Sequence, residues 1–286
     1  SKAMIGLTIV ALGTSAPEIL VSIMSALAGS PSLALGNAVG SNIANMGLVL
    51  GATALIAALP VTSGLVRQDL PALLSVTALT GFLLADHQLS REDAFALISL
   101  LVLLMYLMIR YRKEHSKEMI SPNTETAIPD FDVKGSVINF SVGLLILIAS
   151  SRLLVWGAVD IAKALDVSEA IIGLTIVAIG TSLPELAASI TSALKKQHDI
   201  ALGNIVGSNI LNLIAVLSAA ALIEPINVEP TIFFRDYGIM SALTVLLAVF
   251  ILIPKKVREL SKGEGSLLLI AYIGYLGLLY HQTVNG

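Results

Sequence analysis

The sequence has few charged residues and no cysteine. Asp, Glu, Lys and Arg make up 13% of the 286 residues, whereas hydrophobic residues make up 56%, which is not the balance of a water-soluble domain. The absence of Cys excludes disulfides and thiolate metal sites. No nucleotide-binding motif is present, which excludes an ATP-driven activity, and neither a nucleic-acid partner nor an obligate protein partner is indicated. What the chain has instead is a series of long apolar runs.

These runs predict membrane-spanning helices. A span needs about 20 mostly apolar residues, and nine stretches come close to that length. They cover residues 4–28, 36–59, 69–86, 93–110, 137–163, 170–194, 200–223, 231–253 and 266–282. We therefore predict an all-α polytopic fold, and hence a multi-pass membrane protein in the lipid bilayer.

Two blocks of sequence occur twice. Gly6–Glu18 reads GLTIVALGTSAPE and Gly173–Glu185 reads GLTIVAIGTSLPE, so eleven of thirteen positions are identical at an offset of 167 residues (173 minus 6). The second block recurs at the same offset, as Ala34–Asn45 (ALGNAVGSNIAN) and Ala201–Asn212 (ALGNIVGSNILN). Two matches at one offset indicate a duplicated unit. Polar residues inside apolar runs are expensive, so we expect those of the repeat to be functional.

The duplication predicts the organisation of the chain. We expect a first repeat at residues 1–110, a cytoplasmic linker at 111–135 and a second repeat at 136–286. The linker is predicted because this segment is polar and contains proline. In the second repeat the motif follows the span at 137–163, whose partner in the first repeat would lie before residue 1. We therefore expect that the first repeat lacks its first helix, and that nine spans of ten are present.

The positive charges predict the orientation in the membrane. Thirteen Lys and Arg residues fall on one predicted side: Lys2, Arg67, Arg110, Arg112, Lys113, Lys117, Lys134, Lys195, Lys196, Lys255, Lys256, Arg258 and Lys262. Only three fall on the other: Arg91, Lys163 and Arg235. The basic side is predicted to be cytoplasmic, which puts the linker inside and the C-terminus outside. The two motif helices then run in opposite directions, as in the inverted five-helix repeats of secondary transporters.

Each copy of the first block places two hydroxyl groups and a carboxylate beside a proline. In a helix, Thr14, Ser15 and Glu18 share a face, because they are three and four residues apart. Pro17 has no N–H, so the carbonyl group of Gly13 loses its helical partner and the helix bends. The second copy repeats this set in Gly180, Thr181, Ser182, Pro184 and Glu185. Such irregular backbone is tolerated at membrane depth where it is buried or lines a cavity.

The second block adds amide groups and another hydroxyl group. Asn37, Ser41 and Asn45 are spaced four residues apart in one stripe. The matching stripe of the second repeat contains Asn204, Ser208 and Asn212. Carboxylate, hydroxyl, amide and carbonyl oxygens without imidazole or thiolate suit hard cations such as Ca²⁺, Mg²⁺ or Na⁺. The pattern therefore predicts a cation site, where the two Glu carboxylates balance one divalent ion.

Some of these residues also have structural interpretations. The pairs Gly36-xxx-Gly40 and Gly203-xxx-Gly207 are predicted to be close helix-packing motifs. A single Ser or Thr in a membrane helix commonly bonds to the carbonyl group of the preceding turn, so a structural and a functional role are equally expected for each hydroxyl taken alone. Two Glu residues at symmetric positions beside Pro point to function instead.

These motifs resemble the α-repeats of the cation/calcium antiporter superfamily, which includes the sodium/calcium exchangers. The resemblance rests on ALGTSAPE at residues 11–18 and GNAVGSNIAN at residues 36–45, each present twice, and it is strongest to prokaryotic members. It implies ten helices in two inverted five-helix repeats, with Ca²⁺ and Na⁺ as transported ions, no cofactor, and a location in the prokaryotic cytoplasmic (inner) membrane. Its carried-over ligands are Glu18, Glu185, Thr14, Thr181, Ser15, Ser182, Ser41, Ser208, Asn45, Ala11 and Ala178.

One position departs from the resemblance. The well-studied prokaryotic sodium/calcium exchangers carry Asp where this chain has Asn212. We keep Asn212 among the predicted ligands, but the site has one carboxylate fewer. This leaves the coupling ion open between Na⁺ and a proton- or potassium-linked variant.

Three classes of function follow from these features. The leading interpretation is a secondary antiporter that exchanges Ca²⁺ for Na⁺ by alternating access, with a calcium/proton (or potassium-linked) antiporter as the alternative. A passive cation channel could use the same polar stripes, but inverted repeats with Pro-broken helices favour a transporter. An enzyme is not expected, because no Ser/His or Cys/His pair falls within the spans.

Overall fold

The computed structural model describes residues 11–115, 133–253 and 258–285. Six helices within these ranges are long and apolar enough to cross a membrane, and Ala11–Leu27 is a shorter apolar helix. This confirms the predicted polytopic helical fold, and the chain is a multi-pass membrane protein. The exact number of spans and the division into two repeats stay predictions. Lys2 and most of the predicted linker, residues 116–132, lie outside the described residues.

The helices follow the predicted apolar runs. Up to the linker, the elements are α2 (Ala11–Thr14), α3 (Ala16–Leu27), α4 (Pro31–Ala44), η2 (Asn45–Val49), α5 (Leu50–Ile56), β1 (Leu59–Pro60), η3 (Leu65–Asp69), α6 (Leu70–Leu83), η4 (Leu84–Asp86), β2 (Gln88–Leu89) and α7 (Arg91–His115). After it come α8 (Val133–Leu165), α9 (Glu169–Ile172), η6 (Gly173–Val177), α10 (Ala178–Thr181), α11 (Leu183–Leu194), α12 (His198–Leu211), η7 (Asn212–Val216), α13 (Leu217–Ile223), β3 (Ile226–Asn227), η8 (Ile232–Tyr237), α14 (Gly238–Leu252), β4 (Glu259–Leu260) and α15 (Lys262–Asn285).

Several helices begin earlier or end later than predicted. The predicted span 36–59 is a helix that begins at Pro31, because Pro is well tolerated in the first turn, where its missing N–H has no helical partner. Gly29, with φ +74°, makes the turn just before it. Both ends of the predicted linker 111–135 are also helical, since α7 continues to His115 and α8 begins at Val133.

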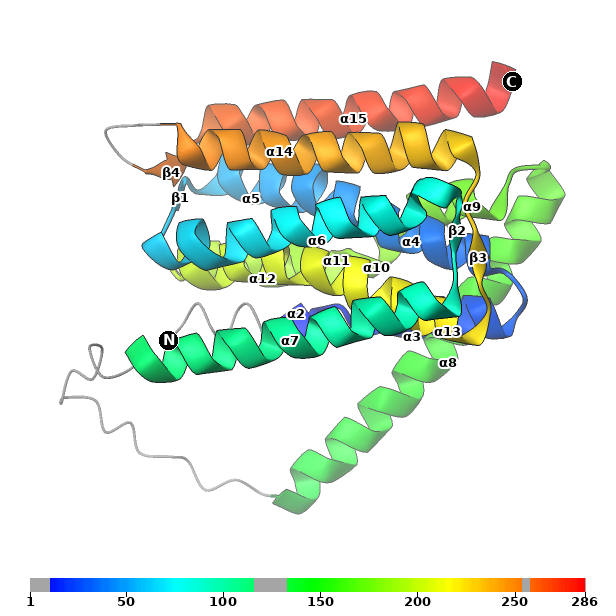
Figure 1. Ribbon diagram of the computed structural model, residues 1–286, viewed down its shortest axis with the longest axis horizontal. Coiled ribbons are helices and arrows are strands. Elements are labelled where there is room, and N and C mark those ends of the chain that lie inside the picture. Colours follow the sequence, from blue (N-terminus) through cyan, green and yellow to red (C-terminus); the bar gives the residue numbers. More distant parts are fainter. Residues whose placement is uncertain (1–10, 116–132, 254–257, 286) are drawn as a thin grey trace.

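The two halves of the chain run in opposite directions. In Figure 1, α2 and α3 point toward the end of the bundle that carries β2 and β3, whereas α9, α10 and α11 start at that end and point away from it. The helices α4 and α5 likewise run opposite to α12 and α13. The end of α15 lies at the β2/β3 end and the end of α7 at the other, as the charge count predicts for the C-terminus and the linker.

Two short strand pairs join the halves at opposite ends of the bundle. Leu59 and Pro60 of β1 pair antiparallel with Leu260 and Glu259 of β4, and β2 pairs antiparallel with β3. Figure 1 shows these pairs at the two ends of the helices. Each pair takes one strand from before the linker and one from after it, and each joins loops that the charge distribution assigns to one side of the membrane.

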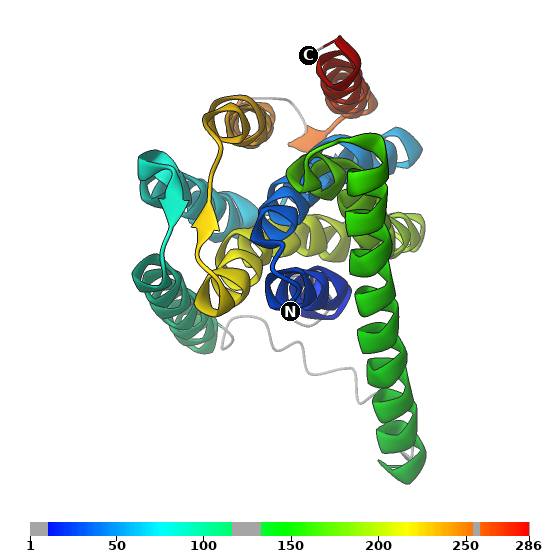
Figure 2. The same ribbon diagram turned by 90° about the vertical axis from the view of Figure 1, so that its right-hand side faces the viewer.

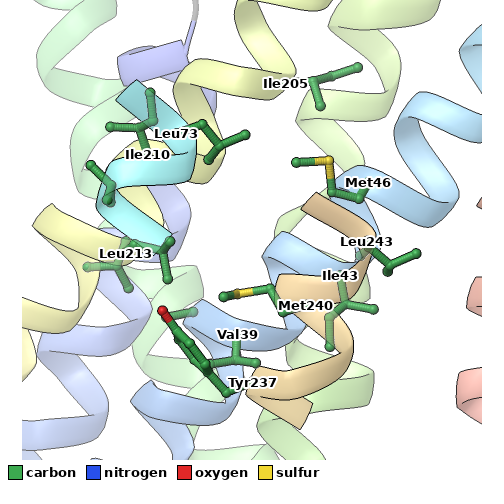
Figure 3. Packing of buried hydrophobic residues seen from close by; sticks show 14 of the residues in the cluster. Val39, Ile43, Met46, Leu73, Ile205, Ile210, Leu213, Tyr237, Met240 and Leu243 are labelled. Carbon is green, nitrogen blue, oxygen red and sulfur yellow. The ribbon is translucent and has the colours of Figure 1, made fainter. Parts of the chain in front are cut away.

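Helix α4 is the centre of the core. All its residues from Leu33 to Ala44 are buried, and seen from the end of the bundle it lies in the middle, while α8 lies on the outside (Figure 2). Figure 3 shows Ile43 and Met46 beside Met240 and Leu243 of α14, all members of one buried cluster. The polar stripe of α4 is therefore held inside protein rather than in lipid.

Small residues bring α4 against the second motif helix. A Cβ atom added to Gly36 would collide with the carbonyl oxygen of Ala170, and one added to Gly40 would lie 2.7 Å from Leu174 Cα. From the opposite side, a Cβ atom on Gly173 would lie 2.9 Å from the backbone nitrogen of Asn37. The predicted packing role of Gly36 and Gly40 is thus confirmed, and the close approach brings α4 next to the second Pro-interrupted helix.

Candidate functional site

Both motif helices are interrupted at the same place. Helix α2 gives way to α3 at Ser15 (φ −83°, ψ 1°), and α10 gives way to α11 at Ser182 (φ −83°, ψ 0°). Pro17 and Pro184 follow in the first turn of α3 and α11, where an N–H group is not needed. The repeated sequence therefore folds into the same local break twice.

The breaks place two carboxylates inside the protein. Glu18 in the first turn of α3 and Glu185 in the first turn of α11 are both 0% exposed. No buried cation among the described side chains offsets them, since the buried ion pair there, Arg235–Asp236, belongs to η8. Two unpaired acids in such a place are costly unless a cation is bound.

The two carboxylates have different hydrogen-bond partners. Glu185 Oε1 accepts hydrogen bonds from Ser15 Oγ and Ser208 Oγ, each at 3.3 Å. Within the described part of the chain, neither oxygen of Glu18 has a hydrogen-bond partner. The hydroxyl group of Ser15 thus bonds to the carboxylate of the other motif helix and not to Glu18 of its own.

Reciprocal hydrogen bonds connect the two copies. Thr14 Oγ1 donates to Asn204 Oδ1 at 3.1 Å, and Thr181 Oγ1 donates to Asn37 Oδ1 at the same distance. These pairs are related by the offset of 167 residues. Ser41 Oγ lies 3.2 Å from Thr181 Oγ1 and joins the same network. The threonines of each copy are thus held by the amide of the other copy.

Backbone oxygens of the break are also hydrogen bonded. The carbonyl oxygen of Ala11 accepts from Ser15 N at 2.8 Å and lies 3.4 Å from Thr14 Oγ1, whose one proton is donated to Asn204. That of Ala178 accepts from Ser182 N at 3.0 Å and lies 3.4 Å from Thr181 Oγ1, whose one proton is donated to Asn37. Each carbonyl can accept two bonds, so each of these oxygens keeps capacity for a further partner beside its backbone bond.

The predicted ligands include six buried oxygen atoms that have no hydrogen-bond partner among the described residues. They are Oε1 and Oε2 of Glu18, Oε2 of Glu185, Oγ of Ser182, and Oδ1 of Asn45 and Asn212. Leaving a buried acceptor unsatisfied costs about 1–3 kcal/mol, and more where it is charged. Oxygen donors of this kind are what hard cations prefer. The arrangement can therefore hold Ca²⁺ or Na⁺ as substrate.

Asn42 and Asn209 belong to the same centre, although they are absent from the predicted ligand set. Asn45 Nδ2 donates to Asn209 Oδ1 at 3.1 Å, and Asn42 Nδ2 donates to the backbone oxygen of Asn209 at 3.1 Å. Both lie in the repeated Gly-Ser-Asn sequence, three residues before Asn45 and Asn212. That repetition is the signal that could have identified them.

Comparison with known proteins gives a consistent result. The family model described as "Sodium/calcium exchanger protein" matches residues 1–110 and 135–281. CaxA of Alkalimonas amylolytica is 43% identical over 98% of this chain and 88% of its own length, and sodium/calcium exchanger MaX1 of Methanosarcina acetivorans is 31% identical over 98% and 89%. A solved structure of the sodium-calcium exchanger NCX_Mj, soaked with Na⁺ and Sr²⁺, superposes with a TM-score of 0.70 at 31% identity, covering 97% of this chain and 87% of that one. The chain therefore belongs to the sodium/calcium exchanger protein family.

Proposed function

We propose that this protein is a secondary antiporter that exchanges Ca²⁺ for Na⁺ across a prokaryotic inner membrane by alternating access. The observation that carries the proposal is the set of six unpartnered oxygen atoms, three of which belong to the buried carboxylates of Glu18 and Glu185. Two carboxylates balance the charge of one Ca²⁺. The family supports the same ions, and a catalytic activity is not part of the proposal.

The proposed ligands come from both copies of the motif. Glu18 and Glu185 supply the charge, and the other oxygens come from Thr14, Thr181, Ser15, Ser182, Ser41, Ser208, Asn45, Asn212, Ala11 and Ala178. Ca²⁺ takes six to eight oxygen ligands in flexible geometry, so this set is large enough for one Ca²⁺ or for several Na⁺ bound in its place. Competition for shared carboxylates is what couples the two ions.

The coupling ion has a second candidate because Asn212 is neutral. Both polar atoms of its side chain are buried without a partner among the described residues. An amide at this position adds no negative charge to hold a further Na⁺. A proton or K⁺ is therefore the alternative coupling ion. A passive channel is disfavoured, since both carboxylates are fully buried.

Uptake of ⁴⁵Ca²⁺ into proteoliposomes tests the proposal. Vesicles loaded with Na⁺ are diluted into Na⁺-free buffer, and parallel samples carry a K⁺ or H⁺ gradient instead. We expect uptake that depends on the outward Na⁺ gradient, its loss in Glu185→Gln, and its retention in Glu92→Gln, a matched neutralisation at an exposed position of α7.

The parallel samples distinguish the Na⁺-coupled antiporter from the alternative functions. Uptake that follows a pH or K⁺ gradient and ignores Na⁺ assigns the protein to the calcium/proton or potassium-linked class. Uptake without any counter-ion gradient indicates a channel. Normal uptake by Glu185→Gln would remove this carboxylate from the site.

A further inference from the structure

Four buried asparagines lie where the two copies of the motif meet. Asn42 and Asn45 come from the first copy, and Asn209 and Asn212 are their equivalents 167 residues later. All four are at most 2% exposed. Asn45 and Asn212 each begin a π-helical turn, η2 and η7. Such turns are rare and occur frequently at functional sites.

One bond in this group fixes the orientation of a site amide. An Asn side chain has a donor end and an acceptor end. Asn45 Nδ2 donates to Asn209 Oδ1 at 3.1 Å, so the donor end of Asn45 is held against the other copy. Its acceptor end, Oδ1, is then one of the six unpartnered oxygens of the site. Without this bond, the amide could rotate and present its NH₂ group, which repels a cation.

The equivalent bond in the other copy is not formed. By the offset of 167 residues, Asn212 Nδ2 would donate to Asn42 Oδ1, and both atoms are buried without a partner in the described part of the chain. Asn42 is instead turned so that its Nδ2 donates to the backbone oxygen of Asn209 at 3.1 Å. The four asparagines thus offer two equivalent bonds, and among the described residues this structure contains only the Asn45–Asn209 bond.

The serines show the same asymmetry between the two copies. Ser15 and Ser208 donate to Glu185, while no hydrogen bond from their equivalents reaches Glu18, since Ser182 Oγ has no partner among the described residues and Ser41 bonds to Thr181. The asymmetry therefore involves both the carboxylates and the amides.

We propose that Asn209 and Asn42 are positioning residues that orient the site amides in turn. Asn209 holds Asn45 in the arrangement seen here, and Asn42 holds Asn212 in the arrangement that opens to the opposite membrane face. The inference rests on the proposed exchange function, because it assigns one bond to each access state. It adds two residues that act on the ligands without contacting the ion.

The test is the sidedness of two matched variants in the full-length chain. Asn209→Leu removes the acceptor for Asn45, and Asn42→Leu removes the acceptor for Asn212, with similar side-chain volumes. In right-side-out and inside-out vesicles, we expect Asn209→Leu to raise the KM for Ca²⁺ about fivefold at one face only, the size expected for one neutral hydrogen bond. Asn42→Leu should do so at the other face only. Asn209→Gln keeps a neutral amide acceptor and should raise the KM less than Asn209→Leu does.

Other outcomes overturn the inference. Equal increases at both faces indicate a merely structural role, and unchanged KM values in both Leu variants indicate no role. If Asn209→Leu does not fold, Asn209→Ala and Asn42→Ala, which also lack an acceptor, replace the Leu pair in the same two-faced assay.

Failure of the proposed function has a different signature. The unmodified protein would then show no Na⁺-dependent Ca²⁺ uptake at either face. The inference is then decided by thermal unfolding of the purified protein over a titration of CaCl₂ and of NaCl. Asn209→Leu should need about fivefold more cation for half of the stabilisation, and Asn209→Gln should need less than Asn209→Leu. An unchanged midpoint in Asn209→Leu, or no stabilisation of the unmodified protein by either salt, overturns it.

Discussion

Replacing Glu18 with Gln separates two opposite effects of this carboxylate. Glu18 is 0% exposed, and neither of its oxygens has a hydrogen-bond partner among the described residues. A buried, unpaired charge destabilises the folded state, so without cations the neutral Gln should leave the protein as stable as before or more stable. With Ca²⁺ the sign reverses, because the variant loses half of the charge that holds the ion.

The size of the second effect follows from charge and distance. A carboxylate oxygen lies about 2.4 Å from bound Ca²⁺, and at an effective dielectric constant of about 20 the attraction between charges of 2+ and 1− is then about 14 kcal/mol. Even where desolvation offsets three quarters of it, about 3.5 kcal/mol remains, which corresponds to roughly 300-fold in Kd. Ca²⁺ at a concentration that saturates the unmodified protein should therefore leave Glu18→Gln largely unbound.

Thermal unfolding of the detergent-purified protein measures both effects. In cation-free buffer the Tm of Glu18→Gln should equal or exceed that of the unmodified protein. Added Ca²⁺ should raise the Tm of the unmodified protein by mass action and leave that of the variant unchanged. Glu92→Gln, at an exposed position of α7, should behave like the unmodified protein in both buffers. A variant that melts several degrees lower without cations, or that Ca²⁺ stabilises fully, would refute this reasoning.

Three further predictions follow from packing, topology and charge. Gly36→Ala should lower the free energy of unfolding by about 1–3 kcal/mol, because its Cβ atom meets the backbone of α9. Gly277→Ala in α15, whose Cβ atom would have no neighbour within 4 Å, should leave the stability unchanged or raise it. Equal melting temperatures of the two variants would contradict the packing. A reporter inserted at Asn123 should be cytoplasmic and one fused after Gly286 should be outside; the same location for both would contradict the charge argument. Exchange should depend weakly on voltage, at about two Na⁺ per Ca²⁺, because a further uncompensated cation is costly. Asn212→Asp should make the voltage dependence steeper. Ca²⁺ flux at clamped membrane potentials measures this, and steep voltage dependence in the unmodified protein would contradict the prediction.

The positions of the helices could be predicted from the sequence because lipid imposes one simple rule. Long apolar runs must become helices, and predicted runs such as 170–194 and 200–223 match helical segments that begin at Glu169 and His198. The ends were less predictable, as Pro31 shows, because a helix can continue beyond its apolar residues. The close packing at Gly36 was also predictable, since only small residues allow such an approach.

The hydrogen-bond partners that connect the two copies could not be predicted from the spacing of residues along a helix. Helical spacing places Ser15 on the face of Glu18, but the hydroxyl group bonds to Glu185, because the break at Ser15 and the packing of the other copy decide where it points. The stripe of every fourth residue likewise led to Asn45 and passed over Asn42. The π-helical turn that begins at Asn45 does not follow from residue type, so the relation between these amides needed the structure.

The difference between the two copies bears on how an exchanger can work. Their motifs are nearly identical, yet Glu185 accepts two hydrogen bonds and Glu18 accepts none among the described residues. Because the same side chains exist in both copies, an arrangement in which Glu18 accepts the bonds and Glu185 does not would form the same kinds of bond and leave the same kinds of group unpaired. The two arrangements should therefore differ little in free energy. A small difference can be shifted by a ligand with modest differential affinity, so binding of Ca²⁺ or Na⁺ at the shared carboxylates is sufficient to select between them.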